Sequence, residues 1–310
     1  MERFGQIVRD QEQFLIVYST TSNVFYEVLA RRLATACEEN SREARLCTAM
    51  ELSNMRADEL ENATLTIVNP FDCYYRIGDS KKFFSRLSAA RRRIMVLAEA
   101  VETQWFKNQF RLPIRYDALV DVGFVSQRDR LGDFDVPYRF LFNGPTQQEV
   151  EKIRRPTSSK RPIPWAIVGH KTDGRVRLVV QLMERLDPGG FVFLPNAGIG
   201  VRKGGSAIGP SGLSSGLSRT RYYIWNSHHD FMYYESFRFL EAILVGAVPC
   251  KIDGRADWRE LRIPGIYPSV QALCNTVHSE GFSSMQDSIK AFYLSQGTLA
   301  NHLEKILEDV

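Results

Sequence analysis

The stretch Glu235-Ser-Phe-Arg-Phe-Leu-Glu-Ala-Ile-Leu-Val-Gly-Ala-Val-Pro249 is the most informative part of the sequence. Its apolar residues recur at helical spacing, and the glycine followed by a proline predicts that the helix ends and leads into a strand. Arg238 and Glu241 are three positions apart, so they share one face of this helix. An arginine beside the free N–H groups of a helix N-terminus is suited to bind phosphate. A carboxylate one turn further along can accept hydrogen bonds from a ribose.

Ser236, Arg238 and Glu241 belong to the pattern Ser-x-Arg-x-x-Glu-Ala-x-x-x-Gly-x-x-Pro. This pattern resembles the donor-binding helix of GT-B glycosyltransferases and is most similar to that of the exostosin-like and CgeB-like groups. The resemblance implies an α/β fold of two Rossmann-like domains that face each other across a cleft. It also implies that Arg238 contacts the diphosphate of a nucleotide-sugar donor and that Glu241 contacts the ribose, with Ser236 in the same donor-binding turn. An ordinary amphipathic helix with an Arg238–Glu241 ion pair is the alternative interpretation.

The stereochemical outcome of the transfer stays open. Retaining GT-B enzymes carry two glutamates eight positions apart, whereas Glu235 and Glu241 are six apart. The resemblance therefore does not decide between a retaining and an inverting reaction.

On both sides of this stretch, strand-like and helix-like segments alternate. In the first half, short apolar runs predict strands at 14–18, 44–52, 63–69, 94–98 and 118–122, and helical spacing predicts helices at 24–38 and 80–92. In the second half we expect strands at 164–168, 191–194, 222–225 and 247–252, and helices at 175–186, 237–244 and 298–307. Strands that alternate with helices favour parallel β-α-β units and two open α/β sheets.

The segment 143–164 is the expected boundary between two domains, because it is poor in apolar residues and rich in proline and basic residues. We therefore predict an N-terminal Rossmann-like domain at 1–150 that binds the acceptor. A C-terminal Rossmann-like domain at 151–310 would bind the nucleotide sugar. The last helix is expected to pack back onto the N-terminal domain.

Basic residues in two loops of the second half are candidates for holding the donor. They are His170, Lys171 and Arg175 in the first strand-to-helix turn, and Arg202 and Lys203 in a Gly/Ser-rich loop expected over 198–218. Similar turns of the family approach the donor phosphates, and a loop of this kind can order over an anionic ligand. The spaced glycines of the loop do not indicate a dinucleotide fingerprint, because no helix is predicted to follow them. A plain solvated turn or surface loop is the alternative for each.

The dipeptide His228-His229 is not expected to bind a metal ion. Neighbouring residues on a strand point to opposite faces, so one metal cannot easily take both rings. His229 is instead expected near the transferred sugar. With the donor diphosphate held by an arginine and the helix dipole, we expect neither a metal nor a cofactor besides the nucleotide-sugar donor itself.

An inverting transfer needs a general base that activates the acceptor hydroxyl. Ligands of α/β sheets bind beyond the carboxyl ends of the strands, so acidic residues after the strands of the first half are the candidates. Glu99 ranks first, followed by Glu102 and Asp72. Each of these carboxylates can equally serve as a helix cap, a turn residue or an ion-pair partner.

Composition restricts the class of protein without identifying the acceptor. The 310 residues carry a net charge of +4, and no apolar run is long enough to span a membrane. Five cysteines without Cys-x-x-Cys spacing indicate free thiols and a cytoplasmic protein. A small molecule, a glycan or a modified nucleic acid remains open as acceptor.

Two other functions also remain open. The basic clusters 91–93 and 160–161 are typical of solvated faces, but they keep a nucleic-acid-binding protein in consideration. A nucleotide-sugar epimerase or hydrolase on the same fold is the other alternative, and it differs from a transferase in not requiring an acceptor.

Overall fold

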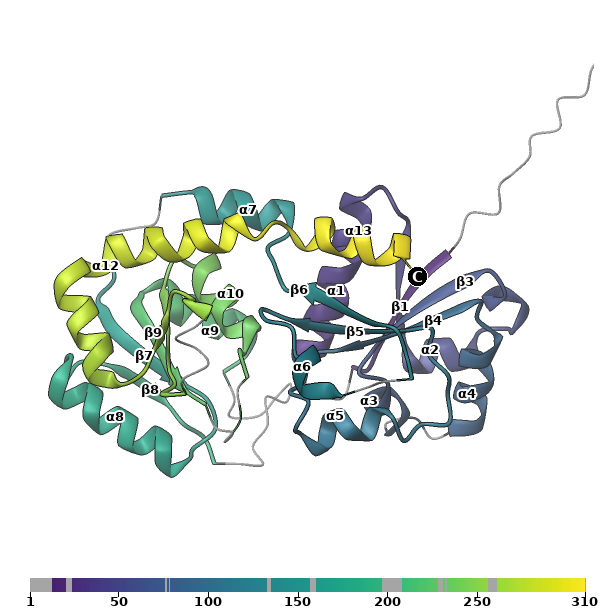
Figure 1. Cartoon of the computed structure of the whole chain (residues 1–310), viewed down its shortest axis with the longest axis horizontal. Coiled ribbons are helices and arrows are strands. Elements are labelled where there is room, and N and C mark those ends of the chain that lie inside the picture. Colours follow the sequence, from purple (N-terminus) through teal and green to yellow (C-terminus); the bar gives the residue numbers. More distant parts are fainter. Residues whose placement is uncertain are drawn as a thin grey trace, which may run out of the picture. The chain divides into compact units, whose positions relative to one another are not determined.

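The computed structural model describes residues 13–20, 24–75, 77, 79–132, 135–156, 160–196, 208–227, 231, 233–255 and 261–309. The chain divides into two compact units, each with its own β-sheet and helices (Figure 1). Unit 1 comprises Met1–Val122, Ser126–Leu141 and Ala300–Val310, and unit 2 comprises Gly123–Val125 and Phe142–Leu299. The predicted α/β fold with two Rossmann-like sheets is confirmed.

The sheet of unit 1 has the strand order β2-β1-β3-β4-β5-β6. Its strands are β1 (Gln13–Tyr18), β2 (Ala44–Thr48), β3 (Ala63–Val68), β4 (Arg92–Leu97), β5 (Ala118–Gly123) and β6 (Tyr138–Phe142). Its helices are α1 (Val24–Glu39), α2 (Ala49–Asn54), η1 (Asp58–Leu60), α3 (Pro70–Tyr75), α4 (Ser80–Ala89), α5 (Gln104–Gln109) and α6 (Arg128–Leu131). Neighbouring strands from β2 to β5 run parallel, as the alternation of strands and helices predicts.

Side chains that alternate along β1 build a core on both faces of this sheet. Leu15 and Val17 join a buried cluster with residues of α2, α3, α4 and α5. Figure 1 shows α3, α4 and α5 together on one side of the sheet. Phe14 and Ile16 point to the opposite face, and α1 packs against β1, β2 and β3. Because both faces are covered, the strands are continuous apolar runs rather than alternating ones.

The sheet of unit 2 has the strand order β11-β10-β9-β7-β8, and its paired strands run parallel. Its strands are β7 (Ile163–Val168), β8 (Phe191–Phe193), β9 (Thr220–Asn226), β10 (Val248–Ile252) and β11 (Ile266–Tyr267). Its helices are α7 (Gln147–Arg154), α8 (Asp173–Arg185), α9 (Pro210–Ser218), α10 (Ser236–Leu244) and α12 (Val270–Ser295).

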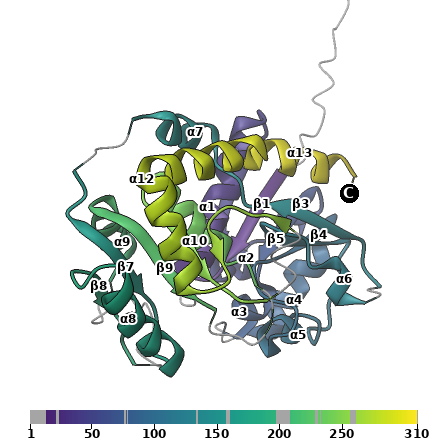
Figure 2. The same cartoon turned by 60° about the vertical axis from the view of Figure 1, so that its left-hand side comes forward.

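Helix α12 has 26 residues and is interrupted by a kink at Gly281. Figure 2 shows that the helix is bent. Gly281 has φ 75° and ψ 169°, a conformation that favours glycine. Helix α13 (Leu299–Asp309) follows, and from Ala300 onward it belongs to unit 1. There Asn40 Nδ2 donates to the carbonyl of Ala300 at 2.9 Å, and Arg42 pairs with Glu304 at 2.8 Å. These contacts attach α13 to the end of α1.

In each sheet the strand order reverses next to the first strand. In unit 1 the chain passes from β1 to β2 on one side and then to β3 on the other. In unit 2 it passes from β7 to β8 on one side and then to β9 on the other. Open α/β sheets bind ligands beyond the carboxyl ends of their strands at such a reversal. The fold therefore directs attention to the ends of β1 and β3 in unit 1 and of β7 and β9 in unit 2.

The expected boundary 143–164 is not a plain linker, because it contains α7. Thr146 and Glu149 form a capping box at the start of this helix, and Val150 and Ile153 are its buried residues. Two apolar positions in eight residues are too few to reveal a helix by periodicity alone.

Two further expectations about elements are wrong. The expected strand 44–52 ends at Thr48, whose side chain caps α2 and starts a helix instead. The expected loop 198–218 contains α9, which has Pro210 in its first turn, a favourable helix position for proline. Residues 197–207 of that loop lie outside the described residues.

Two chain-wide features concern the environment of the protein. The five cysteines are free and buried. Among the described helices, none combines the length and apolar character that crossing a bilayer requires.

Candidate functional site

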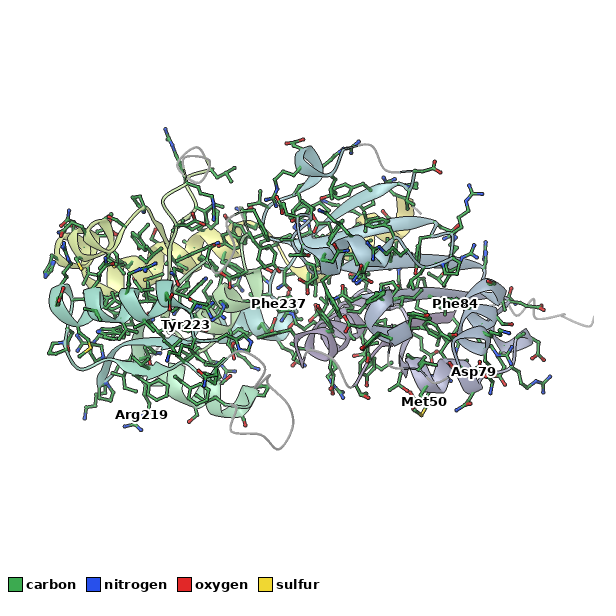
Figure 3. All side chains as sticks on the ribbon, turned by 90° about the horizontal axis from the view of Figure 1, so that it is seen from below. Met50, Asp79, Phe84, Arg219, Tyr223 and Phe237 are labelled. Atoms are coloured by element: carbon green, nitrogen blue, oxygen red, sulfur yellow. The ribbon has the colours of Figure 1, made fainter. Side chains whose placement is uncertain are left out.

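Arg238, in the first turn of α10, is held by three groups of unit 2. Its Nε donates to Glu235 Oε1 at 3.0 Å, and its Nη1 donates to the Val168 carbonyl at 2.8 Å and to Tyr223 Oη at 2.5 Å. Figure 3 shows Tyr223 among the side chains of this unit. Burial acts to lower the pKa of Arg238, but Tyr223 and Glu235 outweigh it and raise this pKa. The guanidinium thus stays charged, and its Nη2 makes no hydrogen bond within the described part of the chain.

Arg175 brings a second guanidinium to the end of β7. It comes from α8, is 2% exposed, and donates from Nη1 to the His170 carbonyl at 2.8 Å. Its buried Nε has no hydrogen-bond partner. Burial and the nearby charge of Arg238 lower its pKa. Gly169 permits the close approach, because a β-carbon there would lie 2.5 Å from Arg175 Nη1 and 3.3 Å from Arg238 Nη2.

Glu235 links this cationic pair to β9. Its carboxylate accepts from Trp225 Nε1 at 2.7 Å and from Arg238 Nε at 3.0 Å. The residue has φ 28° and ψ 54°, in the left-handed region that non-glycine residues seldom adopt. Such conformations persist only where the surroundings impose them, and they cluster at functional sites. The sequence motif did not assign Glu235 a role.

Glu241 lies one turn beyond Arg238 on α10, as the spacing predicts. Its carboxylate is mostly buried and makes no hydrogen bond within the described part of the chain. Desolvation raises its pKa to about 7, against a smaller lowering effect of Arg238. A buried carboxylate without a donor is costly, so this site suits a ligand that supplies hydroxyl donors.

Ser236 faces the interior of unit 2. It is 5% exposed, and its Oγ accepts from Asn143 Nδ2 at 3.2 Å. The Asn143 carbonyl in turn accepts from Tyr293 Oη of α12 at 2.7 Å. These contacts tie the start of α10 to neighbouring parts of unit 2.

A buried lysine at the end of β10 completes the polar groups of unit 2. Lys251 is fully buried; its Nζ donates to the Tyr233 carbonyl and lies 3.5 Å from Asp253, which pairs with Arg255 at 2.7 Å. Burial lowers the pKa of Lys251, while Glu235 and Asp253 oppose this effect. Sequence reasoning missed Lys251, although a lysine within the apolar run 247–252 was a usable signal.

The remaining predicted donor residues fall into two groups. His170 and Lys171 are exposed, and the backbone N–H of Lys171 donates to the Pro195 carbonyl at 2.8 Å. Arg202, Lys203 and His229 lie outside the described residues. Of the predicted donor side chains, Arg175 and Arg238 come together at the end of β7, and Glu241 lies near enough to Arg238 for the guanidinium to lower its pKa.

Glu99 follows β4 in unit 1 and is bound by a side chain that the sequence did not indicate. Tyr26 of α1 donates its hydroxyl to Glu99 Oε1. Burial raises the pKa of Glu99 to about 7, with Tyr26 lowering it and the charge of Asp72 raising it. A carboxylate with a pKa near neutrality is suited to accept a proton in catalysis.

Asp72 and Glu102 are placed differently from each other. Asp72 is 3% exposed, and its Oδ2 accepts from Trp105 Nε1 at 2.9 Å. Glu102 pairs with Arg130 at 2.8 Å. Asp72 therefore shares the electrostatic surroundings of Glu99, whereas Glu102 takes part in an ordinary ion pair.

The residue that follows β3 has two unusual features. Asn69 has φ 45°, is fully buried, and neither of its side-chain amide atoms has a hydrogen-bond partner. Next to it, the rings of Phe71 and Trp105 meet edge to face with centroids 5.4 Å apart. Strain and an unsatisfied buried amide are both uncommon in a purely structural strand end.

The basic clusters 91–93 and 160–161 are solvated only in part, since Arg91 and Lys160 are exposed but Arg161 is buried. Arg161 is 4% exposed and donates to the carbonyls of Leu217, Thr220 and Val245, so it clamps three backbone segments of unit 2. Arg93 pairs with Asp117 at 3.4 Å. These arginines thus have structural partners.

Within the described part of the chain, no group of three or more histidine, cysteine, aspartate or glutamate side chains could hold a metal ion. One Asp-x-Asp triplet, Asp133-Phe134-Asp135, occurs in the sequence, and carboxylates are ligands that divalent cations prefer. Asp133 and Phe134 lie outside the described residues.

Comparison with known proteins shows the fold. No family model and no curated protein sequence matches the chain. An alpha-glucosyltransferase (AGT) solved in complex with UDP is similar with a TM-score of 0.63 and 9% identity, over 96% of this chain and 98% of the other. The pneumococcal O-GlcNAc transferase GtfA, solved with UDP and GlcNAc, is similar over 83% of this chain and 58% of the other, with a TM-score of 0.47 and 10% identity. The first similarity extends over nearly the whole of both chains and shows the two-domain fold.

Proposed function

We propose that the chain is a glycosyltransferase of the GT-B type that moves a sugar from a nucleoside-diphosphate sugar to an acceptor hydroxyl. The observation that carries the proposal is the arrangement around Gly169. Arg238 keeps one nitrogen without a partner, Arg175 keeps a buried nitrogen without a partner, and Glu241 is a carboxylate without a donor. A diphosphate joined to a ribose supplies acceptors for the two arginines and hydroxyl donors for the glutamate.

The two arginines would provide the electrostatic part of catalysis. As the bond between sugar and phosphate breaks, negative charge develops on the departing diphosphate and positive charge on the sugar ring. Preorganised guanidinium groups stabilise the leaving group without reorganising during the step. The proposed reaction therefore draws its positive charge from Arg175 and Arg238 and needs no metal and no further cofactor.

In an inverting reaction, Glu99 would serve as the general base for the acceptor. Its carboxylate accepts the proton from the attacking hydroxyl, and the hydroxyl oxygen forms the new bond to the sugar carbon as the diphosphate leaves. The raised pKa favours this role, because a base with a pKa near the working pH balances ionisation against proton affinity. Asp72 remains the second candidate.

Uridine diphosphate sugars are the proposed donor class. The support is the similarity in fold, over nearly the full chain, to an alpha-glucosyltransferase in complex with UDP. Membership of the exostosin-like or CgeB-like group remains a prediction from the motif. No observation favours the epimerase, the hydrolase or the nucleic-acid-binding alternative over transfer.

Calorimetric titration of nucleotides tests this proposal. We expect UDP to bind the full-length protein and Glu241→Gln to weaken binding at least about 10-fold, since a hydrogen bond to a charged group contributes about 1.5–3 kcal/mol. Glu304→Gln is the matched control, because Glu304 pairs with Arg42 in unit 1. Hydrolysis of UDP-glucose that persists in EDTA would support a reaction without metal. Failure of UDP, ADP, GDP, CDP and TDP to bind would overturn the proposed function.

A further inference from the structure

We propose that Glu235 is a positioning residue of the donor site, which orients Arg238 so that its unpartnered Nη2 is presented to the diphosphate. This inference rests on the proposed function. The Nε edge of the guanidinium is taken by Glu235 at 3.0 Å, and Nη1 is taken by Val168 and Tyr223. With those positions fixed, one nitrogen remains for a ligand.

The remaining nitrogen, Arg238 Nη2, lies close to Gly169, a residue without a side chain. A β-carbon on Gly169 would lie 3.3 Å from Arg238 Nη2 and 2.5 Å from Arg175 Nη1. Both guanidinium groups therefore border the same position at the end of β7. A rotation of Arg238 about its side-chain bonds would carry Nη2 away from that position, and the Glu235 carboxylate opposes such a rotation.

The local structure argues against a merely structural role for Glu235. The residue occupies the N-cap position of α10, yet its side chain makes no capping hydrogen bond. Its backbone lies in the left-handed region, which a glutamate adopts at a cost. Its two carboxylate oxygens are used instead by Arg238 and by the indole of Trp225, which fixes the carboxylate in turn.

A positioning role and a simple charge effect predict opposite results. The Glu235 carboxylate is negative and close to the expected phosphate position, so removing its charge alone should tighten UDP binding. If it orients Arg238, its removal should weaken UDP binding. Uridine has no phosphate, so its binding should not depend on Glu235 in the positioning case.

The experiment compares UDP and uridine binding to the full-length protein, with calorimetry for UDP and NMR titration for uridine. For Glu235→Gln we expect the Kd of UDP to rise about 10-fold, which is within the range of coupling energies of residues in one hydrogen-bond network. The Kd of uridine should change less than about 2-fold. Arg238→Lys removes the Nε that donates to Glu235. In this background, Glu235→Gln should cause little further rise in the Kd of UDP. Such non-additivity shows that Glu235 acts through Arg238.

A second variant keeps the test decisive if Glu235→Gln folds poorly. Trp225→Phe removes the indole donor but leaves Arg238 and Glu235 in place, and it should weaken UDP binding in the same direction by a smaller factor. Glu304→Gln should leave the affinity for both ligands unchanged. Tighter or unchanged UDP binding, an equal loss for UDP and uridine, or additive effects with Arg238→Lys would overturn the inference. If the wild-type protein binds no nucleoside diphosphate, the proposed function itself fails.

Discussion

Units 1 and 2 have the same kind of strand reversal but different charged side chains at it. Beyond β7 and β9, unit 2 gathers the guanidinium groups of Arg175 and Arg238. Beyond the strand ends of unit 1 lie the carboxylates of Asp72 and Glu99. Both sheets reverse their strand order, and in open α/β sheets ligands bind beyond the carboxyl ends of the strands at such a reversal. The side chains on the turns that follow these strands determine which ligand binds and which reaction it undergoes.

The charged side chains at the two strand reversals also have different kinds of hydrogen-bond partner. Arg238 is bound by the carboxylate of Glu235, which helps to keep it positive at any physiological pH. Glu99 and Asp72 accept from the neutral donors Tyr26 and Trp105. A fixed positive charge suits the stabilisation of a leaving group, whereas a carboxylate with a raised pKa suits proton transfer. In the proposed reaction, unit 2 would therefore stabilise the leaving group and unit 1 would supply the group that accepts the proton.

The largest expected effect is that of Arg238→Ala on nucleotide binding. Removing the guanidinium deletes a charge-assisted contact to phosphate and leaves the Glu235 carboxylate without its cation. We expect the Kd of UDP to rise about 100-fold, since two hydrogen bonds involving charged groups contribute about 1.5–3 kcal/mol each but are not fully additive. Calorimetry measures this change. Arg42→Ala removes a comparable Arg–Glu pair in unit 1 and is the control. A loss below about 3-fold would show that Arg238 does not bind the diphosphate.

Glu99→Gln should lower the rate of the reaction without changing the affinity for UDP. The amide cannot take the acceptor proton, so we expect hydrolysis of UDP-glucose, with water as acceptor, to fall about 100-fold, the lower range for loss of a general base. The Kd of UDP should not change, because Glu99 belongs to unit 1 and the nucleotide groups belong to unit 2. Parallel loss of UDP binding would contradict the division of roles.

The same variant should be more stable than the wild type at alkaline pH. The folded protein raises the pKa of Glu99 from 4.5 to about 7, so the folded state binds its proton more tightly than the unfolded state. Stability is therefore lost as the pH rises from about 4.5 to about 7, by up to about 3 kcal/mol from this residue. We expect Glu99→Gln to raise the melting temperature at pH 8 and to change it little at pH 4. A lower melting temperature at pH 8 would show that the carboxylate is structural.

Sequence information was sufficient to place side chains whose positions follow from local spacing. Arg238 and Glu241 lie on one helix, so their three-residue separation fixes their common face regardless of the rest of the fold. Glu99 was predicted because it follows a strand, and parallel strands end at one edge. The alternation of apolar strands and amphipathic helices likewise predicted two α/β sheets.

Contacts between distant segments could not be predicted in this way. Tyr26 and Glu99 are 73 residues apart, and their contact depends on how α1 packs on the sheet. The left-handed backbone of Glu235 could not be predicted either, since nothing in a glutamate favours it. Helix α12 was not predicted, because Gly281 interrupts it and its apolar periodicity is weak.

Gly169→Ala tests whether UDP binding requires the absence of a side chain at the position between Arg175 and Arg238. The added β-carbon would lie 2.5 Å from Arg175 Nη1, so the guanidinium must move from its place beside Arg238. We expect UDP binding to weaken about 10-fold, a cost typical of a small displacement in a preorganised site. The control is Gly216→Ala in α9, where an added β-carbon meets nothing within 4 Å. That change should leave UDP binding unaltered. Equal UDP affinity in both variants would mean that Arg175 does not touch the nucleotide.

The smallest expected effect concerns Ser236, the residue of the motif that faces inward. Its Oγ accepts from Asn143 Nδ2 at 3.2 Å, and Asn143 Oδ1 already has no partner. Ser236→Ala leaves a buried amide donor unsatisfied, which costs about 1–3 kcal/mol. We therefore expect a lower melting temperature with UDP binding unchanged, whereas Ser218→Ala, at an exposed position of α9, should change neither. If UDP binding weakens at an unaltered melting temperature, the serine hydroxyl contacts the donor, as the resemblance to the family implies. In that case the donor site of unit 2 includes Ser236 as well as Arg238.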